Sequence, residues 1–167
     1  MHADQLSLSG GTEAAVALQA LSADHVIQIQ DSEIKKIAAS KTTAVLLPAA
    51  DLYMKCDYPP ARKLIDAGAR VALATDFNPG TSPTQDINLV GLLARLEMKM
   101  TLPEVISAYT VGAAFALGKQ KDRGSLELGK SADFISIRGP WSDLFYSAGS
   151  TLVDQVIVGG KLIDINS

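Results

Sequence analysis

The order of apolar segments along the chain predicts an α/β protein. From the N-terminus to about Gly118, short apolar runs alternate with segments in which apolar residues recur at helical spacing. Strands that alternate with helices form a parallel sheet joined by right-handed crossovers. The strand-like runs are mainly apolar and do not alternate with polar residues, which predicts a sheet with both faces covered. These observations leave two architectures open, a doubly wound sheet and a (β/α)₈ barrel.

Each element is predicted from its composition and from the residues beside it. The strands, short, apolar and partly β-branched, span residues 24–27, 42–47 and 71–75. The helices span residues 11–21, 32–39, 59–67, 87–99 and 102–117. Asp31 is expected to cap the second helix, and Pro59-Pro60 to open the third. Gly68 and Gly118 are expected to end helices in the left-handed conformation.

The length and the C-terminal pattern set the domain organisation. A complete barrel takes about 250 residues and roughly 200 at the least, whereas this chain has 167. If the barrel interpretation holds, about half of the barrel is absent from the chain. Two β-branched runs and a Gly159-Gly160 hairpin turn follow a turn-rich stretch after Gly118. We therefore expect an α/β domain over residues 1–120 and a small antiparallel β unit over residues 121–167.

Composition excludes several classes of protein. The chain is 47% hydrophobic and 20% charged, which suits a soluble globular protein. Its net charge is -3 and no Lys/Arg cluster forms a stripe, so we expect no nucleic-acid partner. No apolar run reaches the roughly 18 residues that a membrane span needs, and the N-terminus lacks the features of a signal peptide. The single cysteine, Cys56, is expected to be inert, in a reducing cytoplasm.

Three polar residues occupy positions where parallel α/β folds build their sites, at the carboxyl ends of strands. His2 stands at the start of the chain, His25 follows Asp24, and Asp76 follows the third strand. Histidine and aspartate are suitable ligands for a zinc or iron centre that activates water. Each also has a structural interpretation, since a histidine at a strand end is more often simply hydrogen-bonded and Asp76 could cap a turn.

The segment after Asp76 is rich in turn-forming residues. Asn78 and Gly80 are interpreted first as turn formers. Thr81, Ser82 and Thr84 are interpreted first as candidate caps for the helix over residues 87–99. The residue pattern alone therefore supports an α/β protein with a candidate metal site.

The sequence also resembles the imidazolonepropionases, a family of amidohydrolases, from His2 to about Ile163. The most specific match is the segment over residues 72–83, which contains Thr-Asp-Phe-Asn-Pro-Gly. Other matches lie in residues 2–7, 10–11, 21–25, 44–48, 98–101 and 124–133, the last of these shared by amidohydrolases in general. The resemblance implies a (β/α)₈ barrel with a small β-sandwich. The implied reaction is the hydrolysis of 4-imidazolone-5-propanoate to N-formimidoyl-L-glutamate in histidine degradation.

The resemblance implies a role for each candidate residue. His2 matches a metal ligand on the fifth barrel strand, and Asp76 matches the metal ligand and base on the eighth. His25 matches a catalytic histidine on the sixth strand that polarises the attacked carbonyl or moves a proton. Positions that match substrate contacts are Gln5, Asn78, Gly80 and Thr81. The implied cofactor is one divalent or iron-type metal ion, Zn or Fe, and the implied partners are a small-molecule substrate and, in the full-length enzyme, a second copy in a homodimer.

The chain departs from the family pattern in three ways. It has two histidines in all, so it lacks the His-x-His pair that supplies two metal ligands on the first strand. The first four barrel strands have no counterpart, so we expect strands five to eight, the C-terminal half of the barrel, with the C-terminal strands of the sandwich. After His25 the family usually has Leu-Glu, where this chain has Val26-Ile27. Met1 directly precedes a motif that is internal in the family, which fits a truncated gene product, an internal start or an excised fragment.

Three functions remain open on these grounds. The leading hypothesis is an imidazolonepropionase segment with an incomplete metal site, active only together with the missing half. The second is another amidohydrolase that acts on cyclic amides or amidines. The third is a non-catalytic fragment that must pair with its missing half, because a half barrel exposes unpaired sheet edges.

Overall fold

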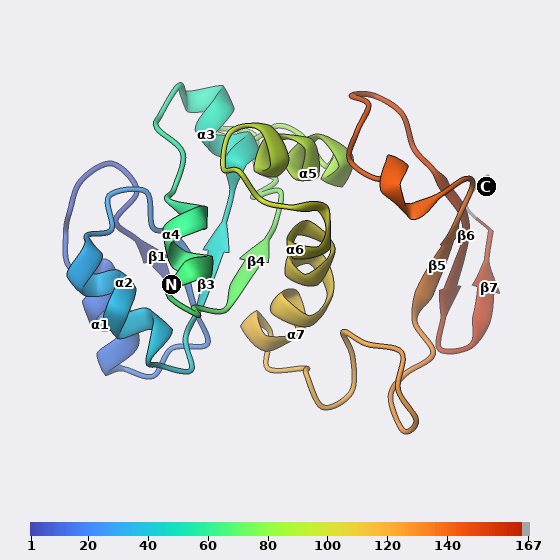
Figure 1. Ribbon diagram of the computed structural model, residues 1–167, viewed down its shortest axis with the longest axis horizontal. Coiled ribbons are helices and arrows are strands. Elements are labelled where there is room, and N and C mark those ends of the chain that lie inside the picture. Colours follow the sequence, from blue (N-terminus) through green and yellow to red (C-terminus); the bar gives the residue numbers. More distant parts are fainter. Residues whose placement is uncertain (165–167) are drawn as a thin grey trace.

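The computed structural model describes residues 1–164 and contains two separate sheets (Figure 1). The first sheet is parallel and has four strands in the order β1-β2-β3-β4. Its strands are β1 (His2–Ala3), β2 (Ser22–His25), β3 (Thr43–Leu46) and β4 (Val71–Leu73). The α/β class and the parallel sheet predicted from the sequence are confirmed. The residue pattern alone did not predict β1, although the family resemblance placed His2 on a strand.

Helices connect and flank the parallel strands (Figure 1). They are α1 (Gly11–Ala17), α2 (Asp31–Ala38), α3 (Pro48–Met54), α4 (Ala61–Asp66), α5 (Ile87–Leu96), α6 (Leu102–Ser107) and α7 (Ala113–Ala116). Helix α3 was not predicted, because Pro48 was interpreted only as the end of a strand. The residue instead occupies the first turn of a helix, where a missing N–H costs nothing.

Two predicted helix caps are wrong. Helix α2 is capped by Gln30 in a capping box with Glu33, so Asp31 is its first helical residue. Helix α5 is capped by Asp86, whose carboxylate accepts the backbone N–H groups of Asn88 at 2.8 Å and Leu89 at 3.1 Å. The threonines and the serine earlier in that loop therefore do not cap α5, because Asp86 lies directly at the helix start.

The two faces of the parallel sheet differ in burial. Ala23, Ala44 and Leu46 lie on one face and are fully buried in the core. The opposite face is covered only in part, since Thr43 and Ala72 are buried there whereas His2 is exposed and Asp24 and Val45 are half-buried. The expectation that both faces are covered therefore holds only in part for the residues that the structure describes.

The predicted helix over residues 102–117 is divided by a π-helical turn, η1 (Ala108–Gly112). This turn packs directly on β4. A Cβ atom at Gly112 would lie 2.0 Å from the carbonyl oxygen of Val71, so only glycine allows the two backbones to approach this closely.

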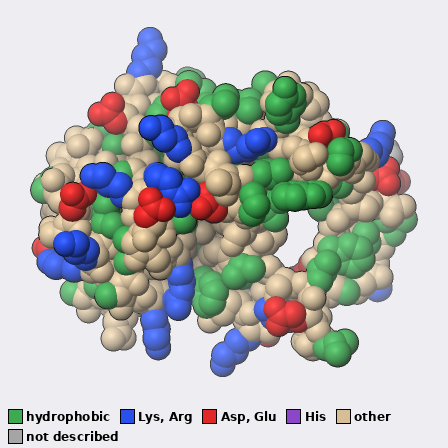
Figure 2. Space-filling view, viewed as in Figure 1, with side chains coloured by type: hydrophobic (Ala, Val, Ile, Leu, Met, Phe, Trp, Pro, Cys, Tyr) green, Lys and Arg blue, Asp and Glu red, His purple; other side chains and the backbone are tan. Residues whose placement is uncertain are grey.

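The second sheet is antiparallel and consists of β5 (Phe134–Ile137), β6 (Val153–Val158) and β7 (Lys161–Ile163). Gly159 and Gly160 form the predicted hairpin turn, both with positive φ. Between β5 and β6 the chain returns to the α/β layer, where Phe145 is buried against α5. Beyond this contact an apolar groove separates the two layers, and Figure 2 shows hydrophobic side chains on both sides of the opening.

None of the helices within residues 1–164 is long and apolar enough to cross a membrane.

Candidate active site

The candidate residues lie at the carboxyl edge of the parallel sheet. His2 begins β1, His25 ends β2, and Asp76 follows β4 by three residues. In parallel α/β folds this edge is where loops can bring side chains from several strands together. The structure thus places these three residues at the edge where the sequence predicted a site.

The two histidines contact each other. Their ring centroids are 4.6 Å apart at an interplanar angle of 65°, an edge-to-face arrangement. His2 is exposed, whereas His25 is 5% exposed and its Nδ1 atom has no hydrogen-bond partner among the described residues. Burial lowers the pKa of His25 and the neighbouring His2 lowers it further, while the charge of Asp76 opposes both. His25 is therefore a neutral imidazole at neutral pH, able to accept or donate a proton.

Backbone strain is concentrated at this edge. Asp4 (φ 45°), His25 (φ 75°), Val26 (φ 49°) and Asp76 (φ 53°) all have positive φ, which residues other than glycine rarely adopt. The value at Val26 is the most costly, because its side chain is β-branched. Such strain persists only where the surrounding structure fixes it, and it clusters at functional sites. Val26 is fully buried, which fixes its position directly after the catalytic candidate His25.

Asp4 organises the loop between β1 and α1. It is 1% exposed, and its carboxylate accepts the backbone N–H groups of Ser9 at 2.7 Å, Gly11 at 3.1 Å and Thr12 at 2.7 Å. Burial alone would raise the pKa of Asp4, but the hydrogen bonds from Thr12 and Ser9 hold it well below the usual range. The carboxylate is therefore charged and satisfied by its own loop, so Asp4 has a structural role beside His2.

Gln5 and helix α3 meet above the sheet edge. Gln5 is 9% exposed, and its side-chain amide donates a weak hydrogen bond to the Met54 sulfur atom at 3.7 Å. Met54 is the last residue of α3, the helix that follows β3. A polar side chain from the loop after β1 thus contacts the end of the helix that follows β3.

The loop after Asp76 is held by Asn78. The Asn78 side-chain amide donates to the carbonyl oxygen of Asp76 at 2.6 Å, and its Oδ1 atom accepts the N–H groups of Gly80 at 2.9 Å and Thr81 at 2.8 Å. Ser82 closes the turn by donating to the carbonyl oxygen of Thr75 at 2.6 Å. The turn-forming interpretation of Asn78 and Gly80 is confirmed, and a substrate role for this loop stays a prediction.

Asp51 is a buried carboxyl that the sequence analysis missed. It lies in α3, is 0% exposed, and neither of its side-chain oxygens has a hydrogen-bond partner among the described residues. Burial raises the pKa of Asp51 to about 7, and the charge of Asp76 adds to the rise.

The donor atoms at this edge fit a zinc or iron ion in kind, but not in number. An imidazole from His2 and a carboxylate from Asp76 are ordinary ligands for either metal. Within residues 1–164, no group of three His, Cys, Asp or Glu side chains lies close enough together to hold a metal ion. The described part of the chain therefore supplies a partial ligand set.

Comparison with known proteins identifies the family. Residues 3–163 match the model of the amidohydrolase family. The chain belongs to the amidohydrolase family. It is 66% identical over 163 residues to an imidazolonepropionase of Bdellovibrio bacteriovorus, covering 98% of this chain and 38% of that protein. It is 45% identical over 165 residues to an imidazolonepropionase of Bacillus velezensis, covering 98% of this chain and 39% of the relative. The chain thus spans about two fifths of the length of these relatives, and the resemblance found in its motifs is confirmed.

Solved amidohydrolase structures share the fold. An adenosine deaminase from Xanthomonas campestris with bound zinc superposes with a TM-score of 0.81 at 24% identity, over 96% of this chain and 44% of that one. Atrazine chlorohydrolase from Arthrobacter aurescens in complex with zinc superposes with a TM-score of 0.79 at 20% identity. The match covers 96% of this chain and 42% of that one. At these identities the likeness concerns the fold alone.

Proposed function

We propose that this chain is the C-terminal part of an imidazolonepropionase, which hydrolyses a ring C–N bond of 4-imidazolone-5-propanoate to give N-formimidoyl-L-glutamate. In this proposal β1 to β4 are strands five to eight of a (β/α)₈ barrel within residues 1–120. The antiparallel strands belong to a small β-sandwich within residues 121–167. The identity to imidazolonepropionases and the share of their length that this chain spans support the assignment.

The observation that carries the proposal is the position of His25. Its ring lies against His2, and the charge of Asp76 acts on it although the three residues come from different strands. Two candidate ligands and a buried neutral base thus lie along the same edge of the sheet. A hydrolytic site needs this combination of a ligand set and a proton-transfer group.

His2 and Asp76 would hold the zinc or iron ion, together with ligands from outside this chain. A metal ion bound there lowers the pKa of its water, so that hydroxide is available near neutral pH. His25 carries or accepts a proton at its unpartnered Nδ1 atom, and its burial keeps bulk water away from that atom. Gln5, Asn78 and the N–H-rich turn that Asn78 holds are proposed to orient the substrate.

A chimeric enzyme tests the proposal. The matching segment of the Bdellovibrio bacteriovorus imidazolonepropionase is replaced by this chain, and formation of N-formimidoyl-L-glutamate is measured. We expect turnover that Asp76→Asn abolishes and that His25→Asn reduces by about 10²–10⁴-fold, the usual contribution of general acid–base catalysis. A folded chimera that does not turn over this substrate, or that keeps its rate in both variants, would contradict the proposal.

The chain alone is expected to be inactive, because a catalytic zinc usually has three protein ligands and this chain supplies two candidates. Purified 167-residue protein is assayed with the same substrate in the presence of zinc or iron(II) salts. Measurable turnover would show that the chain completes the ligand set by itself. Giving the active chimera a panel of cyclic amides and amidines then separates imidazolonepropionase from the other amidohydrolase activities.

A further inference from the structure

Ser82 is buried in a loop that is otherwise largely open to solvent. The loop after β4 exposes Phe77, Pro79 and Pro83, whereas Ser82 is 0% exposed. Its hydroxyl donates a hydrogen bond to the carbonyl oxygen of Thr75 at 2.6 Å. Burying a hydroxyl costs free energy unless it is hydrogen-bonded, so this bond is what allows Ser82 to point inward.

The parallel sheet stops supporting the chain just before Asp76. Among the described residues, the last hydrogen bond from the sheet joins the N–H of Ala74 to a carbonyl oxygen of β3 at 3.2 Å. Beyond it the donors are side chains of the loop, Ser82 to the Thr75 carbonyl and Asn78 to the Asp76 carbonyl, both at 2.6 Å. The loop is closed on itself, because the Asn78 N–H donates to the Ser82 carbonyl oxygen at 3.0 Å. One closed turn thus holds the carbonyl groups on both sides of the Asp76 Cα atom.

This turn holds Asp76 in a strained backbone conformation. Its φ of 53° lies in the left-handed region, which is unfavourable for residues other than glycine. Strain of this kind persists only where the surrounding structure fixes it. Because the peptide groups on either side of Asp76 are both bound, they set the direction in which its side chain leaves the backbone. The bonds from Ser82 and Asn78 go to backbone carbonyls, so their effect on the Asp76 carboxylate is indirect.

We propose that Ser82 is a positioning residue for Asp76, whose hydroxyl acts through the Thr75 carbonyl to fix the backbone that carries the Asp76 carboxylate. This inference rests on the role of Asp76 in the proposed function. Ser82 has no exposed surface that a substrate could touch, so its effect on catalysis passes through the backbone around Asp76. Asn78 holds the other side of Asp76, but the proposed function also gives it a substrate contact. Ser82 therefore isolates the positioning effect.

The test uses the chimeric enzyme that carries this chain. Ser82→Ala removes the hydroxyl, and Ser82→Cys keeps a side chain of similar shape that is only a weak donor. We expect both variants to lower kcat about 10²-fold with KM little changed, because a misplacement of about 1 Å at a reacting group has an effect of this size.

The matched control is Ser40→Ala. The Ser40 hydroxyl also donates to a backbone carbonyl oxygen, that of Ile37 at 2.8 Å, but it lies before β3 at the opposite end of the sheet. Urea unfolding should show a loss of stability in Ser40→Ala as in Ser82→Ala, whereas kcat should fall only in the Ser82 variants.

Crystal structures of the metal-free chimera and of these variants give a readout that does not depend on turnover. We expect Asp76 in Ser82→Ala to leave the left-handed region or its carboxylate to move by about 1 Å, the displacement that the loss of rate implies. Asp76 should be unchanged in Ser40→Ala. If Ser82→Ala does not fold, Ser82→Cys supplies both the kinetic and the structural readout.

The other outcomes overturn the proposal in distinguishable ways. An unchanged kcat in Ser82→Ala, or a lower kcat with Asp76 unmoved, refutes the positioning role and leaves the proposed function standing. Full activity of Ser82→Cys refutes the hydrogen bond as the cause, because that variant keeps only the shape. An equal loss of kcat in Ser40→Ala would show that lost stability lowers the rate. A folded, unmodified chimera without turnover overturns the proposed function and the catalytic part of this inference, while the crystal structures still decide whether Ser82 fixes Asp76.

Discussion

The buried carboxyl of Asp51 should give this chain an unusual dependence of stability on pH. Most paired aspartates stabilise a fold above their pKa, whereas Asp51 does the opposite, because burial raises its pKa from 3.8 to about 7. Below the lower value the group is protonated in both the folded and the unfolded chain, and it has no effect. As the pH rises from there to about 7, the unfolded chain releases the proton and the folded chain keeps it. Stability is therefore lost across this window and is constant above it.

The size of the loss follows from the pKa shift. Each unit of difference between the folded and unfolded states is worth about 1.4 kcal/mol, so a shift of this size gives an upper bound of about 4 kcal/mol above neutral pH. The Asn side chain in Asp51→Asn removes this dependence but leaves a buried amide without a partner, at a cost of about 1–3 kcal/mol. The variant should thus be less stable than the unmodified chain in acid and more stable above neutral pH, by about 1–3 kcal/mol at the two extremes.

Urea unfolding at a series of pH values measures both free energies, and their difference isolates Asp51 from every other titrating group. Asp57→Asn is the matched control, because its carboxylate is exposed and close in sequence. We expect the two stability curves to cross between mildly acidic and neutral pH. Curves for Asp51→Asn and the unmodified chain that run parallel across this window would refute the reasoning, since Asp51 would then titrate alike in the folded and unfolded states.

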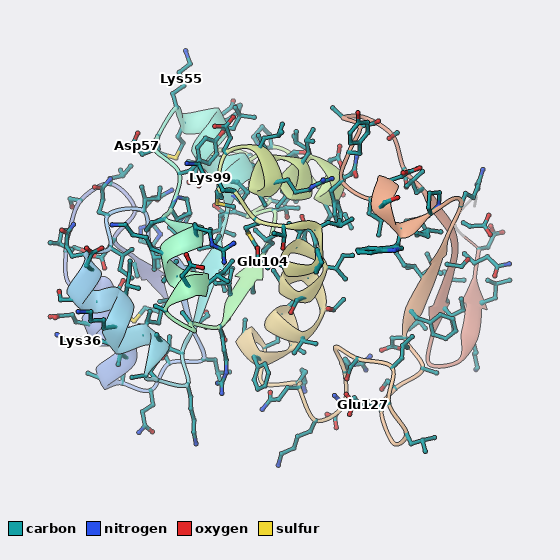
Figure 3. The ribbon with its side chains drawn as sticks, viewed as in Figure 1. Lys36, Lys55, Asp57, Lys99, Glu104 and Glu127 are labelled. Atoms are coloured by element: carbon teal, nitrogen blue, oxygen red, sulfur yellow. The ribbon has the colours of Figure 1, made fainter. Side chains whose placement is uncertain are left out.

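Three further substitutions test the packing around the site. Asp4→Asn should cost about 2–3 kcal/mol in urea unfolding, because the loop N–H groups lose a charged acceptor; a change below ~0.5 kcal/mol would contradict that role. Glu104→Gln, at the position labelled in Figure 3, breaks the paired hydrogen bonds from Arg62 and should cost about 1 kcal/mol at neutral pH. Because Arg62 lowers the Glu104 pKa to about 2, this difference should fade as the pH falls toward that value, and a pH-independent difference would argue against the ion pair. Gly112→Ala places a methyl group against the Val71 carbonyl and should cost more than ~3 kcal/mol, so a normal Tm would exclude the close approach.

The alternation of strands and helices was predictable because it is encoded locally. Apolar runs and helical spacing recovered three of the parallel strands and the hairpin at Gly159-Gly160, each from residues adjacent in sequence. The elements missed have tertiary causes. The π-helical turn exists where Gly112 meets β4, and β1 needs β2 beside it, since two residues form no strand alone. Contacts between segments that are far apart in the sequence produce no periodic pattern of apolar residues, so the sequence alone does not reveal them.

The site was predictable only in part for a similar reason. Strand ends pointed to His25 and Asp76, because the carboxyl edge of a parallel sheet can be located from the strands themselves. Nothing local distinguishes Asp51 from an ordinary aspartate in the first turns of a helix. Its burial depends on how α3 lies against α5 and over the sheet edge, which only the folded chain shows.

Buried ionisable side chains without hydrogen-bond partners lie near the carboxyl edge of the sheet. This indicates that the edge serves to bind a ligand rather than to stabilise the fold. Among the buried side-chain atoms without partners in residues 1–164, the ionisable ones belong to His25 and Asp51, and the charge of Asp76 acts on both. Val26 is strained at the same edge. By contrast, the buried carboxylate of Asp4 is fully hydrogen-bonded within its own loop. A fold that satisfies one buried carboxylate so completely could satisfy another, so the unpartnered atoms of His25 and Asp51 are better explained by binding at this edge than by packing.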